Sequence, residues 1–219
     1  MEDQQQRLIN DNVKGLEQEL GIAPGFLEAV MKEADDWSFV IKVHALAEAA
    51  ITHLLTNALN REELRDIIAA ITMGDSRRGK LAFVAKLKLL EPDIIQFFQT
   101  LGSIRNWFAH DVKSVALRIE DYVNNRPVNE RDSVWRRLCC FVFPTDDTFL
   151  LYDEKPAIPV ITFAKENPRR AIWFSAMNAI AIIYVIKGAE VSRHRHQKHM
   201  ADVAGELLKH AVRRPESTG

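Results

Sequence analysis

The 219-residue chain has only two cysteines, Cys139 and Cys140, and they are adjacent. Two neighbouring cysteines do not make a disulfide framework, so we expect both to be reduced thiols of an intracellular protein. The chain also lacks a net charge of either sign, with 29 lysine and arginine residues against 30 aspartate and glutamate residues. This balance excludes the strong overall field of a general nucleic-acid binder, although local basic patches remain open.

Long hydrophobic runs are also missing. The most apolar segment, AIWFSAMNAIAIIYVI at residues 171–186, contains Ser175 and Asn178, and it is shorter than the roughly 20 apolar residues that a spanning helix needs. We therefore expect a central helix that is buried on nearly all sides. The polar and acidic start MEDQQQRLIN predicts no signal peptide. Together these features predict a cytoplasmic protein that makes no membrane contact.

Apolar residues at helical spacing occur along most of the chain and predict an all-α fold in a single domain over residues 1–219. Asp36 or Ser38 suits the N-cap of the third expected helix, and Pro92 suits the first turn of the sixth. The expected helices cover residues 4–20, 24–36, 38–59, 61–72, 78–90, 92–112, 130–142 and 168–212.

Two polar residues, His44 and Glu48, lie one turn apart at the edge of the apolar stripe on the third expected helix. Polar groups at such an edge face either water or a site. The stripe itself consists of Phe39, Val43, Leu46, Ala47, Ala50, Ile51 and Leu54.

Residues 143–168 interrupt the helical pattern. They include Pro144, Pro156, Pro159 and Pro168, and two short apolar runs, TFLLY and PVITF. This composition favours a proline-rich insertion with a small β-hairpin, placed before a long C-terminal helix over residues 168–212.

The segment GDSRRGKL, residues 74–81, nearly matches a phosphate-binding loop. Gly74, Gly79 and Lys80 fit the G-x-x-x-x-G-K spacing, but Leu81 stands where a serine or threonine would hold magnesium. A helical segment precedes it, whereas such a loop follows a strand. We favour a connection between helices whose basic side chains meet solvent or RNA phosphates, namely Arg77, Arg78 and Lys80.

A second basic segment, SRHRHQKHM, covers residues 192–200. Only His196 and His199 have a spacing at which one helix could present two metal ligands, and no thiolate lies nearby, so we expect no metal site. A solvated helix face is the favoured interpretation. The second interpretation is a contact surface for RNA phosphates, formed by Arg193, Arg195 and Lys198.

An arginine lies on an apolar helix face in the segment IRNWFAHDV, residues 104–112. Arg105 shares this face, at 3.6-residue spacing, with the apolar residues Ile94, Phe98, Leu101, Phe108, Ala109 and Val112. Burying an unpaired guanidinium is too costly. Either Arg105 is therefore paired inside the protein, or the face opens onto a site.

Arg105 and His110 carry the chemistry that RNA cleavage by 2′-hydroxyl attack needs. Histidine exchanges protons near neutral pH, and arginine offers phosphate oxygens a permanently charged fork of donors. This reaction needs no metal or other cofactor. However, one histidine supplies only one of the two groups that acid and base catalysis require. Five residues of helix also turn the two side chains about 140° apart, which favours a twofold homodimer that brings two copies of the motif together.

The run RNWFAH resembles the R-x4–6-H motif of the HEPN superfamily, including the asparagine after the arginine, Asn106. The preceding helices are similar as well, with an acidic residue, Glu48, in KVHALAEAAITHLL and a following helix in GKLAFVAKLKLL. Similar helices with an R-x4-H-D run occur in the mannitol-operon repressor family. The resemblance covers a core at residues 37–115 and, loosely, the C-terminal helix, whereas residues 120–168 have no counterpart.

The resemblance implies a HEPN-like helical bundle that acts as a metal-independent endoribonuclease on RNA, in a homodimer with a composite site. In that arrangement Arg105 binds the scissile phosphate, and His110 transfers a proton or stabilises the phosphate. Asn106 positions one of them or the backbone, and Glu48 orients Arg105. Toxin–antitoxin pairs and phage defence are the usual settings, so an antitoxin or a regulatory protein is a further expected partner.

Two other interpretations remain open. The first is a non-catalytic regulator similar to the mannitol-operon repressor family that acts through protein contacts, since no helix-turn-helix with a basic recognition helix stands out. The second is a helical interaction module in which the motif is degenerate.

Overall fold

The computed structural model describes residues 14–15, 17–18, 21–75, 77–110, 116–141, 148–149, 158–186, 188 and 200. Within these residues the fold is all-α, which confirms the prediction from periodicity. The helices are α2 (Phe26–Met31), α3 (Asp36–Leu59), α4 (Arg65–Ala70), α5 (Lys80–Lys86), α6 (Pro92–Ala109), α7 (Ile119–Asn124), α8 (Val128–Arg137), α9 (Val160–Glu166) and an unlabelled helix over Pro168–Ile186, with a 3-10 turn, η1 (Glu62–Leu64), before α4.

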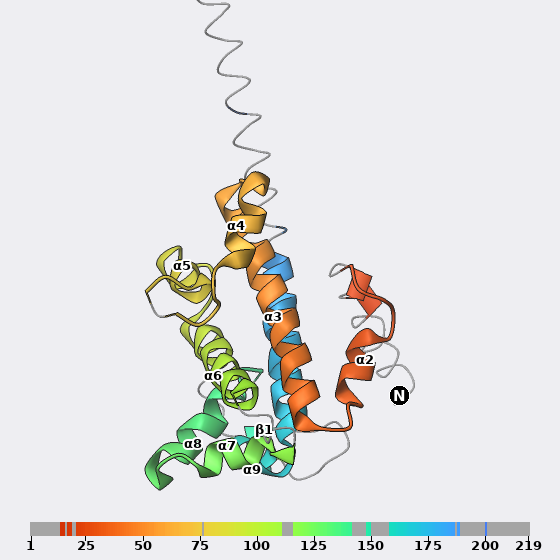
Figure 1. Cartoon of the computed structure of the whole chain (residues 1–219), viewed down its shortest axis with the longest axis vertical. Coiled ribbons are helices and arrows are strands. Elements are labelled where there is room, and N and C mark those ends of the chain that lie inside the picture. The colour runs from red at the N-terminus through yellow and green to blue at the C-terminus, as the bar shows by residue number, and fades with distance from the viewer. Residues whose placement is uncertain are drawn as a thin grey trace, which may run out of the picture.

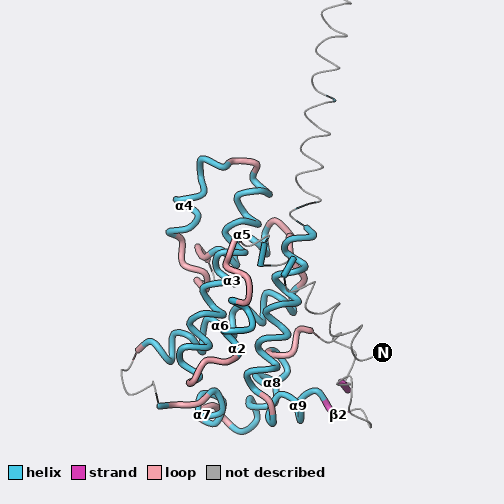
Figure 2. The backbone as a smooth tube through the Cα atoms, turned by 90° about the vertical axis from the view of Figure 1, so that its right-hand side faces the viewer, coloured by secondary structure: helices cyan, strands magenta, loops and turns pink. Residues whose placement is uncertain are grey.

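The 24-residue helix α3 is the central element of the bundle. It packs against α4, α5 and α6, and Figures 1 and 2 show α4 at one end of the bundle and α7 at the other. Every member of the expected apolar stripe on α3 is buried. The stripe meets the buried face of α6, which consists of Ile94, Phe97, Phe98, Leu101, Ile104 and Phe108. Pro92 occupies the first turn of α6, as expected.

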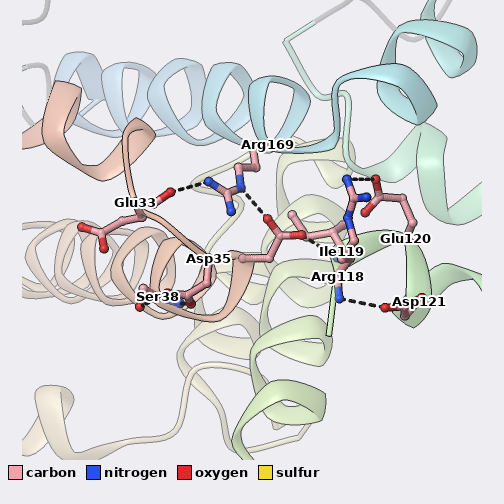
Figure 3. Close-up of polar contacts among 9 residues, drawn as sticks. Glu33, Asp35, Ser38, Arg118, Ile119, Glu120, Asp121 and Arg169 are labelled. Carbon is pink, nitrogen blue, oxygen red and sulfur yellow. Dashed lines mark hydrogen bonds and ion pairs between the residues drawn. The ribbon is translucent and has the colours of Figure 1, made fainter. Parts of the chain in front are cut away.

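The N-cap of α3 is Asp35, and neither Asp36 nor Ser38 takes that role. The Asp35 carboxylate accepts a hydrogen bond from the Ser38 backbone N–H at 2.7 Å, which satisfies one of the free donors at the helix start. Asp36 instead turns inward, where its carboxylate accepts the Ile119 N–H at 2.9 Å and the Arg169 Nε. Figure 3 shows Ile119 and Arg169 converging on this position from two other segments of the chain. Long-range partners thus decide which of the two aspartates caps the helix.

Replacing Asp36 by alanine is expected to lower the free energy of unfolding by about 3 kcal/mol, because Arg169 and the Ile119 N–H would lose a buried charged partner. Asp35→Ala should remove only a cap, at about 1 kcal/mol. The exposed Asp66 on α4 offers a matched control, and Asp66→Ala should change stability by less than about 0.5 kcal/mol. Urea denaturation of the three variants measures the ranking, and equal losses for Asp35→Ala and Asp36→Ala would contradict the role given to Asp36.

The segment after α8 departs in part from the expected insertion. Two short strands, β1 (Thr148–Phe149) and β2 (Ile158–Pro159), pair antiparallel. Of the run PVITF only Pro159 belongs to a strand, and the rest is helical, because Val160, Phe163 and Ala164 lie buried at helical spacing in α9. The remainder of residues 142–157 lies outside the described residues.

The sequence predicted that the helix over Pro168–Ile186 is buried on nearly all sides. This prediction is wrong, because only one side of the helix is buried. Ala171, Ser175 and Ile183 lie on its buried side, whereas Trp173 and Tyr184 are only partly buried. The expected continuation to residue 212, like the helix expected at residues 4–20, falls mostly outside the described residues.

Two described helices are long and apolar enough to cross a membrane by length and composition alone: Asp36–Leu59 and Pro168–Ile186. In the most apolar 18-residue window of each helix, 61% is buried inside the protein for Asp36–Leu59 and 39% for Pro168–Ile186. A core helix of a soluble protein passes the same test, so the two helices are weak evidence for a membrane span.

Candidate functional site

The motif RNWFAH occupies the C-terminal end of α6. Ile104 and Phe108 are fully buried, whereas Arg105 is half-buried and Asn106 and His110 are exposed. The Arg105 Nη1 donates a hydrogen bond to the Asn106 side-chain oxygen at 3.1 Å. His110 is the C-cap residue of α6. The motif therefore presents its polar side chains to solvent while its apolar ones hold the helix in the core.

Arg105 lies at a cleft between α3, α6 and the loop before α5. The cleft has a volume of about 440 Å³, and this opening answers the question of why an arginine occupies an apolar face. The cleft is lined by His44, Glu48, Thr72, Met73, Gly74, Asp75, Gln99, Gly102, Ser103, Arg105 and Asn106.

The expected pairing of Glu48 with Arg105 is wrong. The Glu48 carboxylate binds the Lys80 ammonium group at 2.9 Å, and no ion pair or hydrogen bond joins Glu48 to Arg105 within the described part of the chain. The expectation that Lys80 meets solvent or RNA is wrong too, since its side chain is only 1% exposed and also donates to the Ala69 carbonyl at 3.0 Å. Lys80 begins α5, which packs on α3, so its buried charge needs the carboxylate that α3 provides.

The other side of the Glu48 carboxylate faces His44. The His44 Nδ1 lies 4.0 Å from Glu48 Oε2. Burial lowers the pKa of His44 below its ordinary value; the Glu48 carboxylate opposes this effect, while Arg105 and Lys80 add to it. Burial and the two cations therefore favour the neutral form of the His44 imidazole.

Gly102 of α6 lies beside the His44 ring. A Cβ at this position would lie 3.8 Å from His44 Nε2 and 3.5 Å from the terminal methyl group of Met73. The second nitrogen of the ring therefore lies toward α6, the helix that also carries Arg105. The sequence placed His44 and Glu48 one turn apart at a stripe edge, but it did not indicate that His44 shares a cleft with Arg105.

The backbone N–H groups of residues 77–81, in the loop over residues 74–81, are already bonded within the protein, so they are not free for a phosphate. The Asp75 carboxylate accepts the N–H groups of Arg77 and Arg78, both at 2.8 Å, and the Asp75 carbonyl accepts that of Gly79 at 2.9 Å. The N–H groups of Lys80 and Leu81 bind the carbonyls of Thr72 and Met73. Gly79 is required for packing, because a Cβ there would lie 2.5 Å from the Asp75 carbonyl oxygen.

Arg77 and Arg78 keep exposed side chains on this loop, beside the cleft residue Asp75. They stay candidates for RNA contact. Arg193, Arg195 and Lys198, like His196 and His199, lie outside the described residues.

A second polar cavity adjoins the cleft along α6. It has a volume of about 580 Å³ and includes Arg126 and Arg137. Gln99 and Ser103 line both this cavity and the cleft with Arg105, so the polar side of α6 joins them. Arg126 and Arg137 were not identified from the sequence, because α7 and α8 reach α6 only in the folded chain.

The two cysteines are core residues. Burial raises the pKa of Cys139 and of Cys140 to about 12, so neither thiol is a nucleophile at neutral pH. Among the residues that the structure describes, no three histidine, cysteine, aspartate or glutamate side chains are grouped so that they could hold a metal ion.

Fold and site together define an all-α protein with a charged cleft between its central helix and α6. Comparison of the chain with protein-family models, with curated proteins and with solved structures found no match.

Proposed function

We propose that this protein is a metal-independent endoribonuclease of HEPN type that works as a homodimer. The observation that supports the proposal is the state of Arg105 at the cleft. Its guanidinium is bonded to the uncharged side chain of Asn106, while the nearby carboxylate of Glu48 is held by Lys80. The positive charge of Arg105 is thereby left for a phosphate, which guanidinium binds through paired N–H donors.

The polar side of α6 supports a single RNA strand as the substrate. Gln96, Gln99, Ser103 and Asn106 line the two joined cavities, and ten helical residues extend about 15 Å. Hydroxyl and amide groups suit sugars and base edges, and Arg137 with Arg105 at the two ends suits phosphates.

The position of His110 supports the homodimer. His110 is exposed at the end of α6 and is not among the residues that line the cleft. An isologous twofold contact would bring the His110 of one protomer to the cleft of the other. Arg105 would then bind the scissile phosphate, Asn106 would position Arg105, and His110 would transfer a proton or stabilise the phosphate.

The experiment is cleavage of several single-stranded RNAs by the purified full-length chain in EDTA. We expect cutting without added metal, with a 2′,3′-cyclic phosphate or its hydrolysis product on the 5′ fragment and a 5′-hydroxyl on the other. Lys32→Ala, at the exposed C-cap residue of α2, is the control. Activity that vanishes in EDTA and returns with magnesium would overturn the mechanism.

A second measurement addresses the assembly. Light scattering at micromolar concentration should report about twice the chain mass of 25.0 kDa. A clean monomer that still cleaves RNA would overturn the composite site.

A non-catalytic regulator similar to the mannitol-operon repressor family is the second candidate. Phe83 on α5 and Leu87, the C-cap residue of that helix, lie one turn apart and are 46% and 44% exposed. Adjoining exposed apolar side chains suit protein contacts. An antitoxin or a regulatory protein would suit this surface. This function would be favoured if the wild-type protein cleaves several RNAs no faster than His110→Ala does.

A further inference from the structure

We infer that His44, at the wall of the cleft, is the general base of the proposed reaction, and that Glu48 and Lys80 are its positioning residues. The inference rests on the proposed ribonuclease function and deepens it. It supplies the second proton-transfer group that the RNWFAH motif lacks, because acid and base catalysis need two groups. The motif's own histidine, His110, then serves as the acid.

The first support is the arrangement of three side chains from two helices. Lys80 on α5 binds one oxygen of the Glu48 carboxylate at 2.9 Å, and the other oxygen lies 4.0 Å from His44 Nδ1. A carboxylate facing Nδ1 favours the tautomer that carries its proton there and leaves Nε2 as the proton acceptor. Contacts of this kind are often long before substrate binds. The buried Lys80 holds the Glu48 carboxylate beside the His44 ring.

The second support is the position of His44 Nε2 relative to Arg105. Nε2 lies toward Gly102, and Arg105 follows one helical turn later on the same side of α6. Both residues line the same cleft. A phosphate held by Arg105 would therefore place its ribose within the cleft that His44 borders.

The charged groups that face His44 come from every element around it. Glu48 lies on α3, Lys80 on α5 and Arg105 on α6. Asp75, on the loop before α5, lines the same cleft. Burial and the two cations favour the neutral ring, and Glu48 alone moderates that effect. A neutral imidazole is the form that a general base requires at pH 7.

The proposed step is cleavage of the RNA backbone by the neighbouring ribose 2′-hydroxyl. His44 Nε2 takes the proton of the ribose 2′-hydroxyl while O2′ forms a bond to phosphorus. The bond from phosphorus to the 5′-oxygen breaks, and that oxygen takes a proton from the protonated His110 of the second protomer. The products are a 2′,3′-cyclic phosphate and a 5′-hydroxyl, with His44 now protonated and His110 neutral until proton exchange with water restores both.

The test is His44→Gln in the full-length chain, because glutamine keeps a polar side chain but cannot act as a base. We expect cleavage at pH 7 to fall about 100-fold or more, with RNA binding changed by less than about threefold and the acidic limb of the pH–rate profile lost. His53→Gln is the matched control, because His53 lies on the same helix outside the cleft. If the wild-type protein cleaves RNA and His44→Gln cleaves it at the same rate, the inference is overturned and the proposed function stands.

Glu48→Gln keeps the proposal falsifiable if His44→Gln fails to fold. The Glu48 carboxylate raises the pKa of His44, so its neutralisation should move the acidic limb to lower pH, a change that a merely structural role would not produce. An unmoved limb would overturn the inference.

A binding measurement separates failure of the inference from failure of the proposed function. Titration with uridine 2′,3′-cyclic phosphate should shift the His44 imidazole resonances in NMR spectra of the wild-type chain, and not in Arg105→Ala. If the resonances shift but the protein does not cleave RNA, the proposed reaction is overturned, while His44 is still the group that faces the ligand. Unshifted resonances would overturn the inference.

Discussion

Arg105→Ala is expected to lower the rate of RNA cleavage by about 100-fold or more, while the melting temperature stays within about 2 °C of the wild type. The rate falls because the cleft loses the charged fork that binds the phosphate. Stability is kept because Arg105 is half-buried and its hydrogen bond goes to the exposed Asn106, and surface substitutions rarely change stability by more than about 0.5 kcal/mol.

Two further variants define what Arg105 contributes. Arg105→Lys keeps the charge but loses the paired donors, so it should recover only part of the rate. His110→Ala should lose as much activity as Arg105→Ala with the dimer intact, since His110 is exposed. Single-turnover kinetics measures these rates. A rate for Arg105→Ala within about threefold of the wild-type rate would contradict the role of Arg105.

Lys80→Ala is expected to lower the free energy of unfolding by about 3–5 kcal/mol. Its side chain is 1% exposed and donates to both the Glu48 carboxylate and the Ala69 carbonyl, so the substitution leaves two acceptors without a donor and opens a cavity. For a chain of this length, that loss corresponds to a fall in melting temperature of about 10 °C.

A double substitution separates the lost charge from the lost volume. Lys80→Met with Glu48→Leu removes both members of the pair and keeps apolar volume, so it should be closer to the wild type in stability than Lys80→Ala. Lys86→Ala removes an exposed lysine from the same helix and should change stability by less than about 0.5 kcal/mol. Chemical denaturation followed by circular dichroism measures all three, and equal stabilities for Lys80→Ala and Lys86→Ala would contradict the role of Lys80.

The helices that could be predicted from the sequence are those whose pattern is complete within one segment. The stripe on α3 and the start of α6 at Pro92 depend on residues a few positions apart, and both are as expected. The short helices α7 and α9 were missed, since six or seven residues carry little periodicity. The N–H of Ile119, the first residue of α7, is bound by Asp36, a residue 83 positions away.

The candidate site divides along the same line. Arg105, Asn106 and His110 could be singled out because they lie close together in one segment; the structure places the first two at the cleft and His110 outside its lining. The partner of Glu48 was assigned wrongly because Lys80, 32 residues further along, reaches it only in the folded chain. His44 was noticed but not chosen, because its burial and its neighbours come from α3, α5, α6 and the loop between α4 and α5.

The position of the Asp36 contacts in the chain has a consequence for the order of folding during synthesis. The described residues that line the cleft lie between His44 and Asn106, so all of them leave the ribosome before Arg169, which lies 133 positions after Asp36. Chains fold in order of synthesis, and contacts between distant segments form slowly. The cleft can therefore assemble while the start of α3 still lacks its last partner, and the arrival of Arg169 closes the opposite end of the bundle.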